Sequence, residues 1–200
     1  MTGVALARAV GVSQPRVSQV LQQLTATGAV EATPNGYVGD AASLLDLYRR
    51  RFRPSLFETS YWYSTRSLRD QVAGITDAAQ RAGARVAFSA DIGPDLLAPW
   101  RHPTMTIVYI DVVSERVMER LVPAEGSADA SVIARWTRDP TLLIPAAGWP
   151  AVVDGVPLAD PVQQWYDLLE LGGEDRHEAA DRLRDAIQRR ALAAPRAGNR

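Results

Sequence analysis

Apolar residues near the start of the chain recur at the spacing of an α-helix. Between Val12 and Leu24 they fall at i, i+3, i+4 and i+7, the positions of Val17, Val20, Leu21 and Leu24. Ser13 stands where an N-cap is expected, and Pro15 falls in the first turn, where its missing N–H costs nothing. The pattern predicts a helix from Gln14 to Leu24 with one apolar stripe.

The other face of this helix is polar and nearly uncharged. Its side chains are those of Gln14, Arg16, Ser18, Gln19, Gln22 and Gln23. A face that serves only solubility more often mixes Glu with Lys or Arg in pairs. Amide and guanidinium groups pair instead with base edges in duplex DNA: Gln with adenine, Arg with guanine, and Ser with either. We therefore expect this helix to read base pairs.

The segments on both sides of the helix fit a winged helix-turn-helix. A short helix is predicted over Gly3–Val10, with Gly11 supplying the turn and Val12 filling the corner between the two helices. Two short strands then flank Pro34-Asn-Gly36, because Asn-Gly accepts the positive φ angles of a hairpin. The run Ala9-Val-Gly-Val-Ser-Gln-Pro-Arg-Val-Ser-Gln-Val-Leu21 resembles the winged helix-turn-helix of bacterial transcription regulators. The alternative is a structural helical hairpin without a role in nucleic-acid binding.

One feature departs from that motif. Winged-helix domains normally carry a further helix before the first one predicted here, and Met1 lies almost at the start of that first helix. A start codon assigned too late, a C-terminal segment that fills the same side, or a degenerate motif would each account for the difference.

The charged residues are distributed unevenly. All 22 cationic residues are arginines, which excludes a Schiff-base lysine and a phosphate-loop lysine. Residues 1–53 contain six arginines and three acidic residues, a net charge of +3, whereas residues 54–200 contain sixteen and twenty, a net charge of −4. A basic N-terminal part on an acidic body is typical of a protein that approaches DNA by one end.

A connecting helix is expected from Asp40 to Arg53, with Asp40 as its N-cap. Arginines crowd its last turn, where the helix dipole favours cations: Arg49, Arg50, Arg51 and Arg53. The same arginines are also placed to contact phosphates beside the wing, and the two interpretations are compatible. Pro54 ends the segment, so the predicted domains are residues 1–53 and 54–200.

After Pro54, strand and helix patterns alternate. Strands are expected over Ser60–Ser64, Arg85–Ala90, Thr106–Val113 and, more weakly, Thr141–Pro145, while Ala151–Val153 either extends that sheet or forms a hairpin. Helices are expected over Ser67–Ala82 and Ser114–Leu121, within Asp91–Trp100, after Asp160, and after a cap at Asp175. The fold class is therefore α/β (α+β): an N-terminal winged helix-turn-helix followed by a mixed α/β C-terminal domain.

Signatures of catalysis and metal binding are absent from the sequence. There is no cysteine, His102 and His177 are far apart, and no nucleotide-binding or hydrolase motif occurs. Asp91 and Asp111 each follow a strand, where turn formation or helix capping is commoner than catalysis. We expect no catalytic residue, no metal site and no cofactor. No segment has the pattern of a signal peptide or a membrane span, so a cytoplasmic location without membrane contact is expected.

The C-terminal part carries a second resemblance. The segments that carry it are Ser89-Ala-Asp-Ile-Gly, Leu97-Ala-Pro-Trp, Thr106-Ile-Val-Tyr-Ile-Asp, Val153-Asp-Gly-Val-Pro-Leu-Ala-Asp-Pro-Val-Gln-Gln-Trp-Tyr-Asp-Leu-Leu169 and Ala179-Ala-Asp-Arg-Leu. Together with the winged helix they resemble the AbiEi family, the antitoxins of type IV (abortive infection) toxin–antitoxin systems. The resemblance implies a repressor of its own operon that binds inverted repeats in an operator. It also implies a C-terminal domain that opposes a nucleotidyltransferase-like toxin without forming a stable complex, and it assigns no site there.

The predicted partner is thus double-stranded operator DNA. Bases would be contacted by Gln14, Arg16, Ser18 and Gln19, with Ser13 in the same DNA-binding set; Gln22, Arg49 and Arg50 would lie nearer phosphates, and Tyr37 would sit at the tip of the wing. One alternative is a ligand-sensing regulator with an aromatic pocket in the C-terminal domain, although Trp62, Trp165 and Tyr166 lie on apolar stripes that favour core packing. Another is an enzyme that modifies the toxin.

Overall fold

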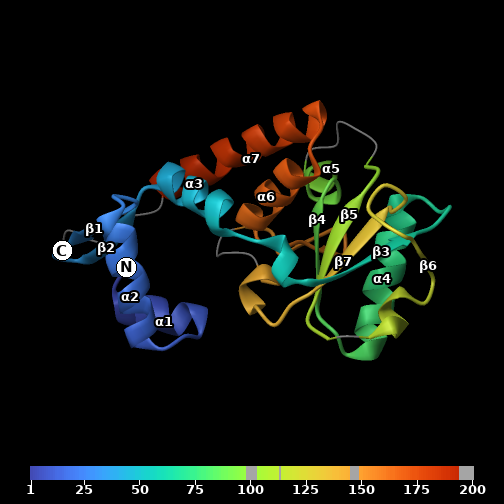
Figure 1. Ribbon diagram of the computed structural model, residues 1–200, viewed down its shortest axis with the longest axis horizontal. Coiled ribbons are helices and arrows are strands. Elements are labelled where there is room, and N and C mark those ends of the chain that lie inside the picture. The colour runs from blue at the N-terminus through green and yellow to red at the C-terminus, as the bar shows by residue number, and fades with distance from the viewer. Residues whose placement is uncertain (98–102, 113, 145–148, 194–200) are drawn as a thin grey trace. The chain divides into compact units, whose positions relative to one another are not determined.

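The computed structural model describes residues 1–97, 103–112, 114–144 and 149–193 (Figure 1). The fold is mixed α/β, as the sequence predicts. Two compact units divide the chain: Met1–Phe52 with the chain from Asp185 onward forms unit 1, and Arg53–Arg184 forms unit 2. This differs from the expected 1–53 and 54–200 mainly in the last helix, which is shared between the two units.

Unit 1 begins with two helices joined by a three-residue turn. Helix α1 spans Gly3–Val10 and α2 spans Gln14–Ala26. Gly11 has a left-handed backbone, with φ of 68°, and its N–H donates to the carbonyl of Ala7, which ends α1. Glycine adopts that conformation without the steric cost of a Cβ, so the chain reverses there as expected.

A β-hairpin follows α2. Strand β1 (Val30–Thr33) pairs antiparallel with β2 (Gly36–Gly39), with Thr33 opposite Gly36. The positive φ lies at Gly36 (117°) rather than at Asn35, so the turn differs from the expected Asn-Gly centre. A Cβ on Gly36 would lie 2.6 Å from the carbonyl oxygen of Met1, which pairs with the outer edge of β2. Glycine is therefore required there by both conformation and space.

The core of unit 1 is small. It consists of Val17 and Leu21 from α2 and Val30 from β1, with half-buried side chains packed around them: Leu6, Ala7, Leu24, Tyr37 and Leu44. Two expectations about this core are wrong. Val12 is 45% exposed and does not fill the corner between the helices, and Val20 is 37% exposed, which leaves the buried stripe of α2 narrower than predicted.

Helix α3 (Ala41–Arg51) is the last element in the N-terminal segment of unit 1. The carboxylate of Asp40 accepts a hydrogen bond of 2.8 Å from the N–H of Ser43, which confirms the predicted N-cap. Leu45 is its buried residue. The arginines of the last turn point away from the core, since Arg49, Arg50 and Arg51 are all exposed.

Unit 2 is built on one mixed sheet. Its strands are β3 (Glu58–Tyr63), β4 (Val86–Ala90), β5 (Thr106–Ile110), β6 (Val122–Pro123) and β7 (Val132–Trp136), in the order β4-β5-β7-β3-β6. Strands β5 and β7 are parallel and every other neighbouring pair is antiparallel. The remaining elements are η1 (Pro54–Leu56), α4 (Leu68–Ala82), α5 (Ile92–Leu97), η2 (Glu115–Met118), η3 (Pro140–Leu142), β8 (Val152–Val153), β9 (Val156–Pro157), α6 (Pro161–Leu171) and α7 (Glu174–Ala193).

Helices cover both faces of this sheet (Figure 1). Side chains alternate along each strand, so on β5 Val108 and Ile110 pack on the α4 side whereas Ile107 and Tyr109 face the other side. All five residues of β4 and all five of β5 are buried. The continuous apolar run that begins at Thr106 is thus buried on both faces, as such a run predicts, and the strand ends at Ile110 rather than at Val113.

Several expected elements of unit 2 differ in the structure. The segment Ser114–Leu121 holds only the 3₁₀ turn η2, and the expected strand over Thr141–Pro145 is instead the 3₁₀ turn η3, with Pro145 outside the described residues. Strand β7, which has strands on both sides, was not expected at all. Residues 151–157 form a hairpin, β8–β9, and α7 begins at Glu174 rather than after a cap at Asp175.

Candidate nucleic-acid interface

The polar face of α2 is exposed along its whole length. The predicted contacts on it are all exposed, and so is Gln23; they are Ser13, Gln14, Arg16, Ser18, Gln19 and Gln22. None of these side chains has a hydrogen-bond or ion-pair partner among the described residues. Seven adjacent polar groups are thus available to an external partner.

The buried stripe fixes which of these side chains faces directly outward. Residues of an α-helix are about 100° apart around its axis, so Gln19 lies about 160° from both Val17 and Leu21. Those two residues are the buried ones of α2. Gln22, Gln23 and Arg16 stand within about 60° of Gln19 around the axis. Ser18 lies about 100° from Gln19, on the flank, and Gln14 lies about 140° from it, near the direction of Leu21. The centre of the outward arc is therefore made of amides and one guanidinium group.

Ser13 occupies the N-cap position without acting as a cap. Its backbone is extended, but its hydroxyl accepts no hydrogen bond from the first turn of α2. Because Pro15 has no N–H, the free N–H groups of that turn belong to Gln14 and Arg16. A hydroxyl and two N–H groups at a helix N-terminus form an arrangement that suits a phosphate oxygen.

Tyr37 is not at the tip of the hairpin. It lies within β2 opposite Ala32, and its side chain is half-buried against the core of unit 1. The two residues of the tip are Pro34 and Asn35, both exposed. The predicted position of Tyr37 at the tip of the wing is therefore wrong, because the alternation of side chains along β2 directs this ring inward.

Arg49 and Arg50 lie in the last turn of α3. Both are exposed and neither has an ion-pair partner among the described residues. The rings of Tyr48 and Phe52 stack beside them, with centroids 5.0 Å apart. The two guanidinium groups are thus free to meet phosphates as well as to complement the dipole of α3.

The two strand-end carboxylates are held in ion pairs. Asp91 accepts from the guanidinium group of Arg176 at 2.6 and 2.9 Å and from the N–H groups of Thr104 and Met105. Burial alone would raise the pKa of Asp91, but the hydrogen bonds and charge of Arg176 and the two N–H groups lower it. Asp111 accepts 2.7 Å bonds from the N–H and Nε of Arg85. Both carboxylates are thus held by an arginine and by backbone N–H groups.

Acidic and histidine side chains are the candidate ligands for a metal ion. No group of three or more acidic or histidine side chains there is placed to hold a metal ion. His177 is an exposed residue of α7, and His102 lies outside the described residues. Among the described helices, none is long and apolar enough to cross a membrane.

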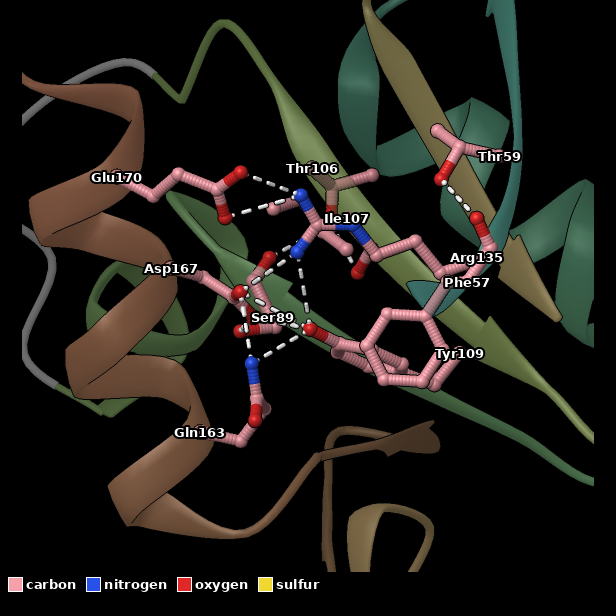
Figure 2. A network of polar contacts seen from close by, with 10 residues as sticks. All are labelled: Phe57, Thr59, Ser89, Thr106, Ile107, Tyr109, Arg135, Gln163, Asp167 and Glu170. Carbon is pink, nitrogen blue, oxygen red and sulfur yellow. Dashed lines mark hydrogen bonds and ion pairs between the residues drawn. The ribbon is translucent and has the colours of Figure 1, made fainter. Parts of the chain in front are cut away.

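Unit 2 also contains a buried polar cluster that no sequence pattern predicted (Figure 2). Asp167 of α6 is completely buried and accepts four kinds of donor: the hydroxyl of Ser89 at 2.6 Å, the hydroxyl of Tyr109 at 2.9 Å, the guanidinium of Arg135 at 3.0 Å and the amide of Gln163 at 2.9 Å. Arg135 also donates to both oxygens of Glu170, at 2.8 and 2.9 Å. The cluster joins α6 to β4, β5 and β7.

This cluster is closed to substrates. Its five inner residues are at most 4% exposed, and only Glu170 reaches solvent. Burial and the charge of Asp167 raise the pKa of Tyr109 well above its usual value, so its hydroxyl stays protonated and donates to Asp167. Asp167 accepts hydrogen bonds from four side chains and is packed under a helix, although the buried Nε–H of Arg135 has no partner among the described residues. This is the geometry of a structural pin that holds α6 on the sheet.

The cluster predicts a specific pH dependence of stability. Burial raises the pKa of Asp167 to about 6, against donation from Arg135 and its other partners, whereas in the unfolded chain the value is near 3.8. At pH values between these two pKa values, Asp167 is protonated more often in the folded state than in the unfolded chain. Its contribution to the free energy of unfolding therefore falls as the pH rises and is constant above about 6. Urea denaturation of the wild type and of Asp167→Asn across this range checks it. A free energy of unfolding of the wild type that rises with pH in this window, relative to that of Asp167→Asn, would contradict the prediction.

Two hollows of unit 2 are too small for a metabolite. The one beside α4, lined by Gln71 and Arg120 among others, has a cavity volume of about 10 Å³, roughly that of one water molecule. The one beside Trp149 and Gln164 has no room for water. Trp165, which the sequence places on an apolar stripe, is 2% exposed and is part of the packed interior. Neither hollow resembles an aromatic ligand pocket.

Among the described residues, the outward arc of α2 thus presents a continuous set of exposed, unpaired hydrogen-bonding groups, with the free hydroxyl of Ser13 at its N-terminal end and, in the same unit, the free arginines of α3. Comparison of the chain with models of protein families, with characterised proteins and with solved structures gives no match.

Proposed function

We propose that this protein is a DNA-binding transcription regulator that inserts α2 into the major groove of an operator. The arrangement of α1, a glycine turn, α2 and the β1–β2 hairpin supports reading unit 1 as a winged helix-turn-helix. In this proposal the side chains of Arg16, Ser18 and Gln19 contact bases, and those of Gln22, Arg49 and Arg50 contact phosphates.

One observation carries the proposal: the outward arc of α2 is exposed, rich in hydrogen-bonding groups and free of carboxylates. Residues 14–26 include no Asp or Glu, and no described side chain satisfies the amides on this arc. A carboxylate on this face would repel phosphates, whereas amides and a guanidinium group match the donors and acceptors of base edges. The excess of three positive charges over residues 1–53 favours approach by the same unit.

The regulator is proposed to repress its own operon as the antitoxin of a type IV toxin–antitoxin system. This part depends on the resemblance to AbiEi antitoxins and extends to a nucleotidyltransferase-like toxin opposed without a stable complex. In unit 2 the inner polar cluster is closed and the strand-end carboxylates are paired, which suits a domain without catalysis. Co-expression with a neighbouring toxin gene, scored by growth rescue, tests it.

DNA binding is tested with the full chain and the duplex upstream of its own gene. Fluorescence anisotropy at physiological salt should show binding at least about 10³-fold tighter than to a random duplex of the same length. Chemical footprinting should place protection at guanine N7 atoms, which lie in the major groove. Equal affinity for the two duplexes, or protection confined to the minor groove, would overturn the assignment.

The arginines of α3 give a separate prediction. Changing Arg49→Ser and Arg50→Ser together should weaken binding about equally for operator and random duplexes, because phosphate contacts are the same for every sequence. The slope of log affinity against log salt should become less steep by about 2, since each phosphate contact contributes about 0.9. Anisotropy titrations at four salt concentrations measure this slope. An unchanged slope would show that these arginines only complement the dipole of α3.

A further inference from the structure

Gln23 is outside the predicted set of contacts, yet it stands in one row with two of them. Arg16, Gln19 and Gln23 follow one another at i, i+3 and i+7, which is the spacing of one helix face. All three are exposed, and none has a partner among the described residues. This row runs along the outward side of α2, beside the line opposite Val17 and Leu21.

The chemistry of the row favours bases over phosphates. A neutral amide releases no counterions when it meets a phosphate, so Gln gains little there compared with Arg. On a base edge the same amide forms two hydrogen bonds with adenine, donating to N7 and accepting from N6. The carboxylates that would accept from cytosine N4 are absent from α2. The row therefore contains two side chains that suit adenine and one that suits guanine.

The spacing of the row matches consecutive base pairs. Each residue advances about 1.5 Å along a helix, so Arg16 and Gln23 are separated by about 10 Å along the axis. Base pairs are stacked about 3.4 Å apart, so this length covers about three steps. Gln19 lies between the ends, about one step from Arg16 and about two from Gln23.

We infer that Gln19 and Gln23 each read an adenine and that Arg16 reads a guanine, so unit 1 selects a half-site biased toward A·T pairs. The half-site contains one G·C pair and two A·T pairs within four consecutive base pairs, in the order of Arg16, Gln19 and Gln23. This inference rests on the proposed DNA binding and goes beyond it by naming the sequence class that the site takes. It also adds Gln23 as a specificity-determining residue.

The test starts with selection of binding sites from a random duplex library by the full-length protein. The selected duplex is then made with 7-deazaadenine at each adenine in turn, which removes the N7 acceptor and leaves Watson–Crick pairing intact. Binding is measured for the wild type, Gln19→Ala and Gln23→Ala. Gln80→Ala is the matched control, because it makes the same change at an exposed position of α4 in unit 2.

Each of the two variants should bind the selected duplex about 5- to 150-fold more weakly, while Gln80→Ala binds like the wild type. One 7-deaza position should lose its effect in Gln19→Ala and the other in Gln23→Ala, to within about twofold. Selected sites without A·T pairs at these steps, or equal 7-deaza effects in all proteins, would overturn the inference and leave DNA binding standing. A library from which no duplex is enriched would overturn the inference and the proposed function together.

Discussion

Changing Arg135 to methionine is expected to lower the free energy of unfolding of unit 2 by about 3–5 kcal/mol. The side chain is 5% exposed and is the cationic partner of Asp167, which is fully buried. Methionine has a similar length and fills the apolar part of the space, so the loss comes from leaving a buried carboxylate without its cation rather than from a cavity. Urea denaturation followed by circular dichroism at pH 7 measures it.

Arg81→Met is the matched control for this change. Arg81 pairs with Glu119 at 3.4 Å, but both side chains are more than half exposed, so its loss should cost at most about 1 kcal/mol. Adding Asp167→Asn to Arg135→Met should recover part of the stability, because an amide carries no charge that needs a partner. Equal effects of Arg135→Met and Arg81→Met would mean that the buried cluster is not a structural pin.

Local patterns predicted most elements of the fold. The helix α4, for example, follows from an N-cap at Ser67 and apolar residues one turn apart, and the oxygen of Ser67 accepts from the N–H of Asp70 at 3.2 Å as such a cap should. The strand at Thr106 follows from a continuous apolar run. In both cases the signal lies within a few residues of the element that it specifies.

Strand β7 was missed because its signal depends on the rest of the fold. The segment Val132–Trp136 alternates between the two faces of the sheet, but Arg135 stands where a buried apolar residue would be expected. Its charge is satisfied by Asp167 and Glu170 on α6, more than thirty residues away in the chain. Only the folded arrangement makes a buried arginine compatible with an inner strand.

The sequence predicted the exposed face of α2 correctly, but it misplaced Tyr37 in the neighbouring hairpin. Exposure of the amide face follows from the period of α2 alone, since the buried stripe fixes the opposite side. The inward position of Tyr37 depends on the register of β1 and β2, where Gly36 rather than Asn35 carries the positive φ. A one-residue difference in the turn reverses which side chain faces solvent, so the sequence alone did not place this ring.

The double variant Arg16→Ala, Gln19→Ala is expected to lose about 2–6 kcal/mol of operator-binding free energy, a weakening of about 30-fold or more. Each lost base contact contributes about 1–3 kcal/mol, and the two side chains lie on adjacent turns of the same face. Both are exposed and unpaired among the described residues, so the free energy of unfolding should change by no more than about 0.5 kcal/mol. Anisotropy with the operator duplex, alongside a urea denaturation curve, measures both quantities.

The matched control is Gln80→Ala with Arg138→Ala, which removes one exposed amide and one exposed guanidinium group from unit 2. It lowers the net charge of the chain by the same amount, so it separates the loss of base contacts from a general loss of positive charge. Random-duplex binding should fall only slightly in both double variants, because Arg16 is one of several cations in unit 1. Operator binding by the α2 variant as tight as that of the wild type would mean that another surface of the protein reads the DNA, even if the full chain remains a specific binder.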